Sequence, residues 1–343
     1  MGTIKKPFIS VILPCYNEEV ILESNLTFIV NYLENVSQKY EWEILIVNDG
    51  SKDNTGNIAD EIASRNNKIR VVHHPVNLNL GHALQTGFSN AKGEIMVVLD
   101  IDLSYSVDHI EKMVDTLIAT CADIVVASPY MKGGKVTAVP FFRKIMSQWV
   151  NIFMRIASQE KYHTYTGMVR AYRREFIQKL NLKTKDYEIN PEILYKAMIL
   201  RARIIEIPAH LDWTEQNKHK GNRTSSIRVL RGVFSGMMSG FIFRPYIFFI
   251  GIGTVLFFLS MYQLIWLLVD TLNGMIDFAT YISESENAFS LSLAHQFNIH
   301  PQTFLVGGIT FIAAIQFLSL GFLSLQSKRY FEELFHLGTS FKK

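Results

Sequence analysis

The sequence predicts an α/β protein in which a doubly wound, mostly parallel sheet precedes a pair of long apolar helices. Up to about residue 127, apolar runs of strand length alternate with polar turns and helix-length segments, and this unit recurs four times. Beyond about residue 240, residues 245–269 and 303–325 contain no charged side chain. The chain of 343 residues is therefore expected to combine a soluble domain with a membrane segment.

Each strand is predicted where an apolar, largely β-branched run ends in a polar turn. The expected strands are residues 8–13, 43–47, 69–72, 95–99 and 123–127. The expected helices run from about 20 to 36, from 53–55 to about 64, from the 77–83 turn to about 90, and from about 107 to 121. In such sheets ligands bind outside the carboxyl ends of the strands, so the polar turns after the strands should line one crevice.

Two carboxylates, Asp100 and Asp102, follow the buried run 95–99 directly. Their spacing at a strand end directs both side chains into one turn, where a cation can share them. Oxygen ligands of this kind suit Mg²⁺ or Mn²⁺, which also holds substrate phosphates. The first strand is followed by an acidic turn and not by G-x-G-x-x-G, which indicates a nucleotide whose phosphates are neutralised by metal.

The composition narrows the classes of protein. A net charge of only +3 does not favour nucleic acid as a partner. Cys15 and Cys121 cannot build a disulfide framework or a zinc site by themselves, and both are expected to be buried and reduced. The histidines show no metal-ligand spacing and are expected in loops (His73, His74, His163 and His219). Residues 1–10 lack an apolar signal core, so the first domain is expected in the cytoplasm.

The two uncharged stretches are each long enough to cross a hydrocarbon core of ~30 Å. The linker, residues 271–302, carries acidic residues but neither Lys nor Arg, whereas both flanks are basic. The positive-inside rule predicts a two-helix hairpin with the linker outside and both termini in the cytoplasm. The expected divisions are a domain at 1–225, a juxtamembrane amphipathic helix at 226–244, the hairpin at 245–326 and a basic tail at 327–343.

Residues 143–154 form a further amphipathic segment. Basic residues begin it, and an apolar stripe follows at helical spacing (Ile145, Met146, Trp149, Val150 and Phe153). Such a helix lies either at a membrane surface or against the core of its own domain.

The motifs PCYNEE, VNDGSKDNT, NLGHAL and LDIDLS, in this order, resemble the family 2 glycosyltransferases with the GT-A fold, which use nucleotide-sugar donors. Residues 128–136 with Arg143, Lys144 and Ser147 resemble the acceptor region of dolichol-phosphate mannose synthases and related polyprenyl-phosphate glycosyltransferases. The resemblance spans roughly residues 8–245. It departs from the family at Pro129, which replaces an arginine, and at His82 and Ser104.

The resemblance implies roles for individual residues. The nucleotide would contact the turns after the strands (Pro14, Tyr16, Asn17, Glu18 and Gly81), and Asp49 would hold the base. Asp100 and Asp102 would hold the metal on the diphosphate. Arg143 and Ser147 would hold the acceptor phosphate, and Lys132 and Arg170 are further candidates for neutralising it.

The expected function is inverting transfer of a sugar from a UDP- or GDP-linked donor to a dolichyl or undecaprenyl phosphate, at the cytoplasmic face of a membrane. A phosphate acceptor is already ionised at pH 7, so no general base is needed. Transfer to a glycolipid hydroxyl would need one, and the nearby carboxylates are Glu188, Glu192 and Asp212. A non-catalytic membrane scaffold with a degenerate transferase domain is the third reading, and association of hairpins into a homo-oligomer is left open.

Overall fold

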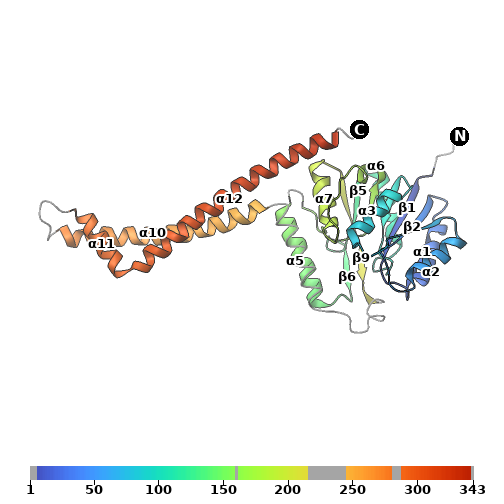
Figure 1. Cartoon of the computed structure of the whole chain (residues 1–343), viewed down its shortest axis with the longest axis horizontal. Coiled ribbons are helices and arrows are strands. Elements are labelled where there is room, and N and C mark those ends of the chain that lie inside the picture. The colour runs from blue at the N-terminus through green and yellow to red at the C-terminus, as the bar shows by residue number, and fades with distance from the viewer. Residues whose placement is uncertain (1–5, 159–160, 215–244, 280–286, 341–343) are drawn as a thin grey trace. The chain divides into compact units, whose positions relative to one another are not determined.

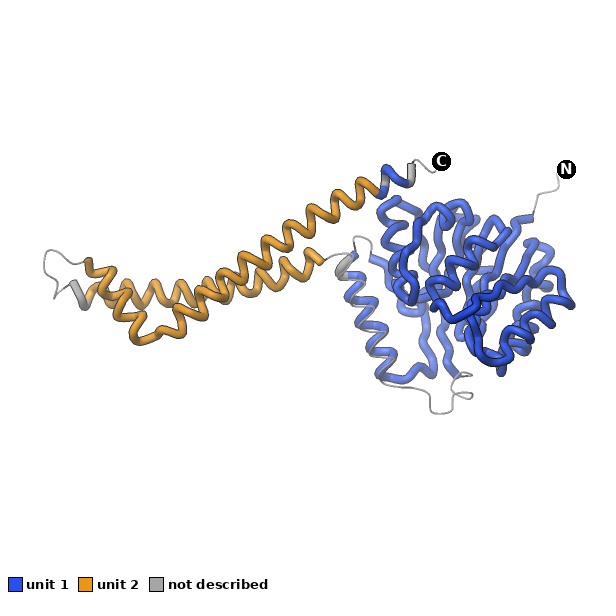
Figure 2. Tube along the Cα trace, viewed as in Figure 1, with its two compact units in different colours: residues 1–240, 335–343 blue, residues 241–334 orange. Residues whose placement is uncertain are grey.

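The computed structural model describes residues 6–158, 161–214, 245–279 and 287–340. The chain divides into two compact units, residues 1–240 with 335–343 and residues 241–334 (Figure 2). The first unit contains the sheet and the second contains long apolar helices (Figure 1). The predicted juxtamembrane helix at 226–244 lies outside the described residues.

The main sheet has seven strands in the order β3-β2-β1-β4-β7-β5-β8. Their bounds are β1 Phe8–Cys15, β2 Glu41–Asn48, β3 Ile69–His73, β4 Ile95–Val98, β5 Ile124–Ser128, β7 Arg170–Arg173 and β8 Ile204–Pro208. Every neighbouring pair is parallel except those of β7, which runs antiparallel to β4 and β5. The predicted doubly wound, mostly parallel sheet is confirmed.

The topology places a switch point at the carboxyl ends of β1 and β4, and we call this edge of the sheet, where a ligand is expected, the crevice. From β1 the chain moves outward to β2 and β3, then returns to form β4 on the other side of β1. The connections after β1 and after β4 lead in opposite directions along the sheet, to β2 and to β5, so the segments that follow these two strands diverge. Ligands bind at such switch points. The turns that the sequence singles out therefore lie side by side.

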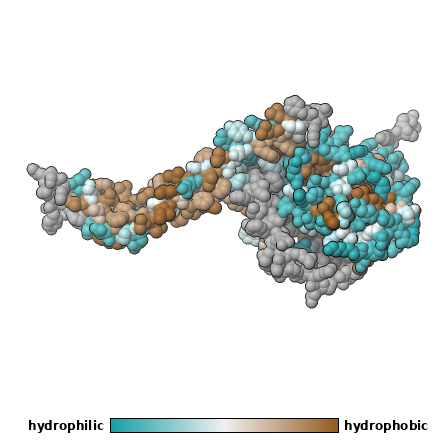
Figure 3. Space-filling view, viewed as in Figure 1, coloured by the Kyte–Doolittle hydropathy of each residue, from teal (hydrophilic) through white to brown (hydrophobic). Residues whose placement is uncertain are grey.

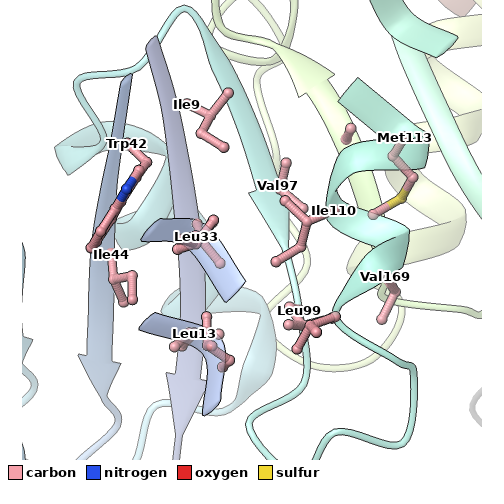
Figure 4. Packing of buried hydrophobic residues seen from close by; sticks show 14 of the residues in the cluster. Ile9, Leu13, Leu33, Trp42, Ile44, Val97, Leu99, Ile110, Met113 and Val169 are labelled. Atoms are coloured by element: carbon pink, nitrogen blue, oxygen red, sulfur yellow. The ribbon is translucent and has the colours of Figure 1, made fainter. Parts of the chain in front are cut away.

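Alternate residues of β1 fill the cores on the two faces of the sheet. Ile9 and Leu13 pack with α1 (Leu22–Asn35) and α4 (Asp108–Ala119), in the cluster that Figure 4 shows. Ile12 packs on the opposite face with residues of α3 (Leu80–Asn90) and α7 (Ile189–Ile199). This unit also contains α2 (Thr55–Arg65) and the short α6 (Arg174–Ile177).

A second, two-stranded sheet lies next to the turn that carries Asp102. Its strands, β6 (Lys135–Thr137) and β9 (His210–Asp212), are parallel, and α5 (Phe141–Ala157) follows β6. The Asp212 backbone N–H donates to the Ser104 carbonyl at 2.8 Å, and Tyr105 forms a bridge with Leu211. This small sheet therefore ties the residues around α5 to the turn after β4.

The second unit consists of α10 (Pro245–Ala279), α11 (Ala288–Ile299) and part of α12 (Pro301–Ser340). Both long helices extend beyond the predicted spans, and residues 271–302, expected as a loop, are mostly helical where they are described. The reason is local. No proline interrupts α10 after residue 269, Asn287 caps α11 by accepting from the Phe289 N–H at 3.0 Å, and Pro301 begins α12.

Residues 245–276 and 301–335 are long and apolar enough to cross a membrane. In each helix, only 17% of the most apolar stretch of 18 residues is buried. Their outward surface is largely apolar (Figure 3). Glycines bring α10 and α12 close together: a Cβ on Gly253 would lie 2.9 Å from Leu318, and one on Gly321 would lie 2.5 Å from Ile250. Small residues are what closely packed membrane helices require, so the pair suits a membrane hairpin.

Candidate active site at the carboxyl ends of β1 and β4

Three carboxylates gather in the crevice between the loops that follow β1 and β4. Burial raises the pKa of Asp100 well above its usual value, and the charges of Asp102 and Glu18 raise it further. Asp100 makes no side-chain hydrogen bond within the described residues. A divalent cation would relieve this concentration of negative charge.

The donor set fits a hard cation that is shared with a ligand. Within the described residues, no three His, Cys, Asp or Glu side chains are arranged to enclose a metal ion. Asp100 and Asp102 therefore offer two carboxylates, and the remaining positions would be filled by water and phosphate oxygens, as is usual for Mg²⁺. One oxygen of Asp102 also accepts from the Ser104 N–H at 3.0 Å, which fixes the turn.

Hydrogen bonds join the loop after β1 to the loop after β2. Asn17, with φ 56°, donates its backbone N–H to Ser51 Oγ at 3.0 Å and accepts from the Lys52 N–H at 2.8 Å. The Glu18 N–H donates to Thr55 Oγ1 at 2.8 Å. The Asn17 side-chain oxygen is therefore occupied by the protein, which supports a positioning role for this residue, while Tyr16 remains 40% exposed beside it.

Asp49 directly follows β2 in a buried position, only 4% exposed. Its Oδ1 accepts from His74 Nδ1 at 2.7 Å and from the Leu78 N–H at 2.9 Å. His74 Nε2 lies 2.8 Å from Thr86 Oγ1. His74 lies in the loop after β3, as the sequence predicted, but its ring is buried against Asp49 and fixes the carboxylate. His73, which was also expected in a loop, is instead the last residue of β3.

Gly81 makes a close backbone contact where the sequence predicted a nucleotide contact. Its N–H donates to the Lys185 carbonyl at 2.9 Å, and a Cβ at this position would lie 2.4 Å from the Lys185 carbonyl carbon. The glycine is explained by the approach of residues 184–185. Its N–H is thus not available to a phosphate in this arrangement.

Glu192 holds the segment before α7 in place. Its carboxylate is 3% exposed and accepts from the backbone N–H groups of Lys183 and Thr184 at 2.9 Å, and from Lys196 Nζ at 2.5 Å. A carboxylate with this many donors is a poor general base. The structure therefore favours a structural role for this candidate base.

Tyr187 extends from this segment toward the carboxylates and was not predicted from the sequence. Burial raises the pKa of Tyr187, and the charges of Asp186, Asp100 and Glu18 add to this effect while Arg143 opposes it. The ring is nevertheless 68% exposed. Tyr187 is therefore near enough to Asp100 and Arg143 for their charges to act on it, and much of it stays open to solvent.

Arg143, in the first turn of α5, rests on the ring of Trp213 at 4.3 Å from the ring centroid. Desolvation lowers the pKa of Arg143, and the charges of Tyr187, Asp102 and Tyr130 act in the opposite direction. The guanidinium stays protonated at any physiological pH. Arg143 is therefore a cation held beside the carboxylate site, and Trp213 is a second residue that sequence reasoning missed.

Ser147 lies one turn further along α5 and accepts a hydrogen bond from the Tyr130 hydroxyl at 2.9 Å. The structure thus brings Arg143, Ser147 and Tyr130 together. Lys132 is exposed in the turn between β5 and β6, and no described contact joins it to the carboxylates. Pro14 is part of β1, paired in register with Val47.

The structure does not favour Arg170 as a candidate for neutralising the acceptor phosphate, because its side chain is buried in the core. Arg170 is 0% exposed, and it donates to the Asn190 carbonyl at 2.9 Å and to the Tyr165 carbonyl at 2.7 Å. It begins β7, a strand in the interior of the sheet, so its side chain enters the core. A similar correction applies to Cys121, which is exposed, whereas Cys15 is buried as expected.

Residues 10–180 match the family described as glycosyl transferase family 2. A polyprenol monophosphomannose synthase from Mycolicibacterium smegmatis is 31% identical over 205 residues, which cover 58% of this chain and 75% of the relative. The chain belongs to glycosyl transferase family 2. The family predicted from the sequence motifs is confirmed.

Other relatives are similar over the same part of the chain. A dolichol-phosphate mannosyltransferase from Pyrococcus furiosus is 32% identical over 203 residues, 58% of this chain but only 55% of the relative. A dolichyl-phosphate beta-glucosyltransferase from Trichomonas vaginalis is 28% identical over 230 residues, 65% of this chain and 70% of the relative. The sugar named in these relatives differs, so the similarity does not select one.

The solved structures agree on the fold. Glucosyl-3-phosphoglycerate synthase from Mycobacterium tuberculosis in complex with phosphoglyceric acid superposes with a TM-score of 0.50 at 20% identity. The match covers 68% of this chain and 80% of that structure. At this level the likeness concerns the fold alone, and it agrees with the predicted GT-A architecture of the first unit.

Proposed function

We propose that this protein is a membrane-bound inverting glycosyltransferase that moves a sugar from a nucleoside diphosphate to a polyprenyl phosphate. The observation that carries the proposal is that Asp102, which lies beside Asp100, is near enough to Arg143 for its charge to act on the guanidinium. A carboxylate pair suits a metal-bound diphosphate, and a fixed guanidinium suits a second phosphate. The relatives named for dolichyl and polyprenyl phosphate substrates support the same acceptor class.

In this proposal Asp100 and Asp102 would hold Mg²⁺ or Mn²⁺, and the ion would stabilise the negative charge of the leaving diphosphate. Glu18 and Tyr16 lie on the nucleotide side of the crevice, and Asp49 holds the base. Arg143 binds the acceptor phosphate bidentately while Trp213 keeps the guanidinium plane in place. Ser147 and Tyr187 orient the same phosphate through their hydroxyl groups.

The transfer is a single displacement. An acceptor phosphate oxygen forms a bond to the anomeric carbon as the bond from that carbon to the diphosphate oxygen breaks. The nucleoside diphosphate departs with the electron pair, and the anomeric configuration inverts. No proton has to be removed from an ionised phosphate, which agrees with the absence of an available carboxylate base at Glu192.

The membrane supplies the acceptor in this proposal. The apolar helices within 245–276 and 301–335 form the anchor, and the distribution of Lys and Arg around them favours both termini in the cytoplasm. On the first unit, α5 exposes large apolar side chains at its start and middle: Phe141 is 78% exposed, Phe142 60% and Trp149 67%. We assign this surface of α5 to contact with lipid headgroups, while its Val150 and Met154 pack into the core.

The proposal is tested with the full chain in liposomes containing undecaprenyl or dolichyl phosphate, Mg²⁺ and labelled UDP- and GDP-sugars. We expect a labelled lipid that mild acid cleaves, in the wild type and not in Asp102→Asn. Arg143→Ala should lose transfer yet retain nucleotide binding, whereas Arg65→Ala, a matched change of an exposed arginine on α2, should be silent. Binding of nucleotide without transfer from any donor would support the scaffold instead, and acid-stable label would indicate a hydroxyl acceptor.

A further inference from the structure

The two oxygens of Asp49 differ in what the protein leaves open to a ligand. Oδ1 already accepts two hydrogen bonds, from His74 Nδ1 at 2.7 Å and from the Leu78 N–H at 2.9 Å. Oδ2 has no hydrogen-bond partner among the described residues. The Asp49 side chain is only 5% exposed, and Oδ2 is not among the fully buried polar atoms that lack a partner, so its small accessible surface is where a ligand can meet the carboxylate. A ligand donor can therefore bond Oδ2, whereas Oδ1 is already engaged.

His74 is held in a fixed position, so it keeps Oδ1 of Asp49 occupied while Oδ2 stays open. Its side chain is 8% exposed, and Thr86 Oγ1 contacts its Nε2 at 2.8 Å on the side away from Asp49. With a proton on Nδ1, His74 donates to Asp49 and accepts from the Thr86 hydroxyl, so every polar atom of the ring is paired. The ring cannot turn away from Asp49 without breaking both bonds. Oδ1 is therefore closed to a ligand as long as His74 stays in place.

Nucleobases differ in the number of adjacent donors that they present to a carboxylate. Uracil presents a single N–H, at N3. Guanine presents two neighbouring donors, at N1 and N2, which match two acceptors. One open oxygen suits the single N–H of uracil, whereas the two guanine donors would have to share that oxygen at poorer angles than two separate oxygens allow, and a site disfavours a ligand whose polar groups are poorly paired.

We infer that the donor site selects uracil over guanine, and that His74 is the positioning residue that sets this preference by occupying one oxygen of Asp49. The inference rests on the proposed function, because it takes Asp49 as the residue that meets the base. It assigns the donor to the uridine diphosphate sugars. His74 itself touches no substrate and acts only through Asp49.

The neighbouring histidine provides a matched control. His73 ends β3 and contacts Asn48 Nδ2 and Asp60 Oδ1, each at 3.0 Å, and no hydrogen bond joins it to Asp49 within the described residues. A His73→Ala variant therefore removes an imidazole from the adjacent position without changing the Asp49 oxygens. A difference between the two variants reports on Asp49 alone.

The test is calorimetric titration of the detergent-solubilised full chain with UDP and with GDP in Mg²⁺. We expect the wild type and His73→Ala to bind UDP about tenfold or more tightly than GDP. His74→Ala should bring the two affinities to within about threefold of each other, and His74→Gln, whose amide can still donate to Oδ1, should restore most of the preference. Thermal unfolding of each variant establishes that it is folded.

The outcomes separate the inference from the proposed function. Equal affinities in the wild type, tighter binding of GDP, or a preference unchanged in a folded His74→Ala variant would overturn the role of His74 and leave the transferase proposal intact. Failure of the wild type to bind either nucleotide would overturn both.

Discussion

The backbone N–H of Gly81 donates to the carbonyl of Lys185 at 2.9 Å, which joins the start of α3 to the segment before α7. This contact links the two sides of the crevice. Gly81 follows the loop that contacts Asp49 through Leu78, and Lys185 precedes Tyr187 by two residues. The position of Tyr187 therefore depends on a backbone contact that only glycine permits.

Substitution of Gly81 by alanine should displace the segment that carries Tyr187. The added Cβ would lie 2.4 Å from the Lys185 carbonyl carbon, which is backbone and cannot rotate away. We expect a loss of stability of about 1–3 kcal/mol and a fall in transfer activity, measured by thermal unfolding and by the liposome assay. Gly251→Ala is the control, because no atom lies within 4 Å of its added Cβ, and it should change neither quantity appreciably.

Removal of the Trp213 ring should weaken acceptor binding selectively. The ring supports the Arg143 guanidinium at 4.3 Å, and a cation–π contact of this kind contributes about 0.5–2 kcal/mol. Trp213→Leu is expected to raise KM for polyprenyl phosphate about three- to tenfold and to leave KM for the donor unchanged. Trp213→Phe keeps an aromatic face and should retain most of the affinity. Equal losses for donor and acceptor would contradict the assignment of Arg143 to the acceptor.

Substitution by lysine should have different effects at the two arginines that the sequence assigned to the acceptor phosphate. It should lower stability at Arg170 and weaken acceptor binding at Arg143. Arg170→Lys loses the paired donation to the Asn190 and Tyr165 carbonyls in the core, so the unfolding midpoint should fall by roughly 5–10 °C. Arg143→Lys should leave the midpoint within about 2 °C and raise KM for the acceptor. If Arg170→Lys kept its stability but bound the acceptor poorly, that result would contradict the structural role assigned to Arg170.

The stability that Glu192 contributes to the first unit should be lost in acid. Burial raises the pKa of Glu192, but hydrogen bonds from Lys196 and Thr184 lower it more, so the folded pKa lies below the usual value. Its contribution is therefore complete above the unfolded pKa of about 4.3 and is lost as the pH falls through the folded pKa. Glu192→Gln should destabilise the protein at pH 7, and the difference from wild type should shrink below about pH 4 in denaturation measured as a function of pH.

The sequence was sufficient for strands β1 to β5 and for placing Asp100 and Asp102 directly after β4, because both rest on local patterns, whereas β7 and β8 were not predicted. The buried run before Asp100 and the polar turns after β1 and β2 are contiguous in the chain, and parallel topology brings their ends together. The apolar stretches around 245–269 and 303–325 are also local signals, although both helices continue further than the uncharged segments.

Contacts between distant residues could not be read from such patterns. Arg170 follows a motif with a one-residue shift, and only the place of β7 inside the sheet reveals that its side chain is buried. His74 resembles any polar residue after a strand until Asp49 is found 2.7 Å away. Trp213 meets Arg143 through the pairing of β6 with β9, two short strands whose composition gave no strand prediction.

Phosphorus NMR of the acceptor during the reaction tests the central claim most directly. A polyprenyl phosphate is a monoester whose resonance moves with pH around its second ionisation, near pH 6 for phosphate monoesters. With the wild-type protein, Mg²⁺ and the accepted donor, we predict that this signal is replaced by a phosphodiester resonance that does not move between about pH 5 and 8, and that Asp102→Asn produces no such change. Sugar consumed while the monoester signal persists would contradict transfer to phosphate.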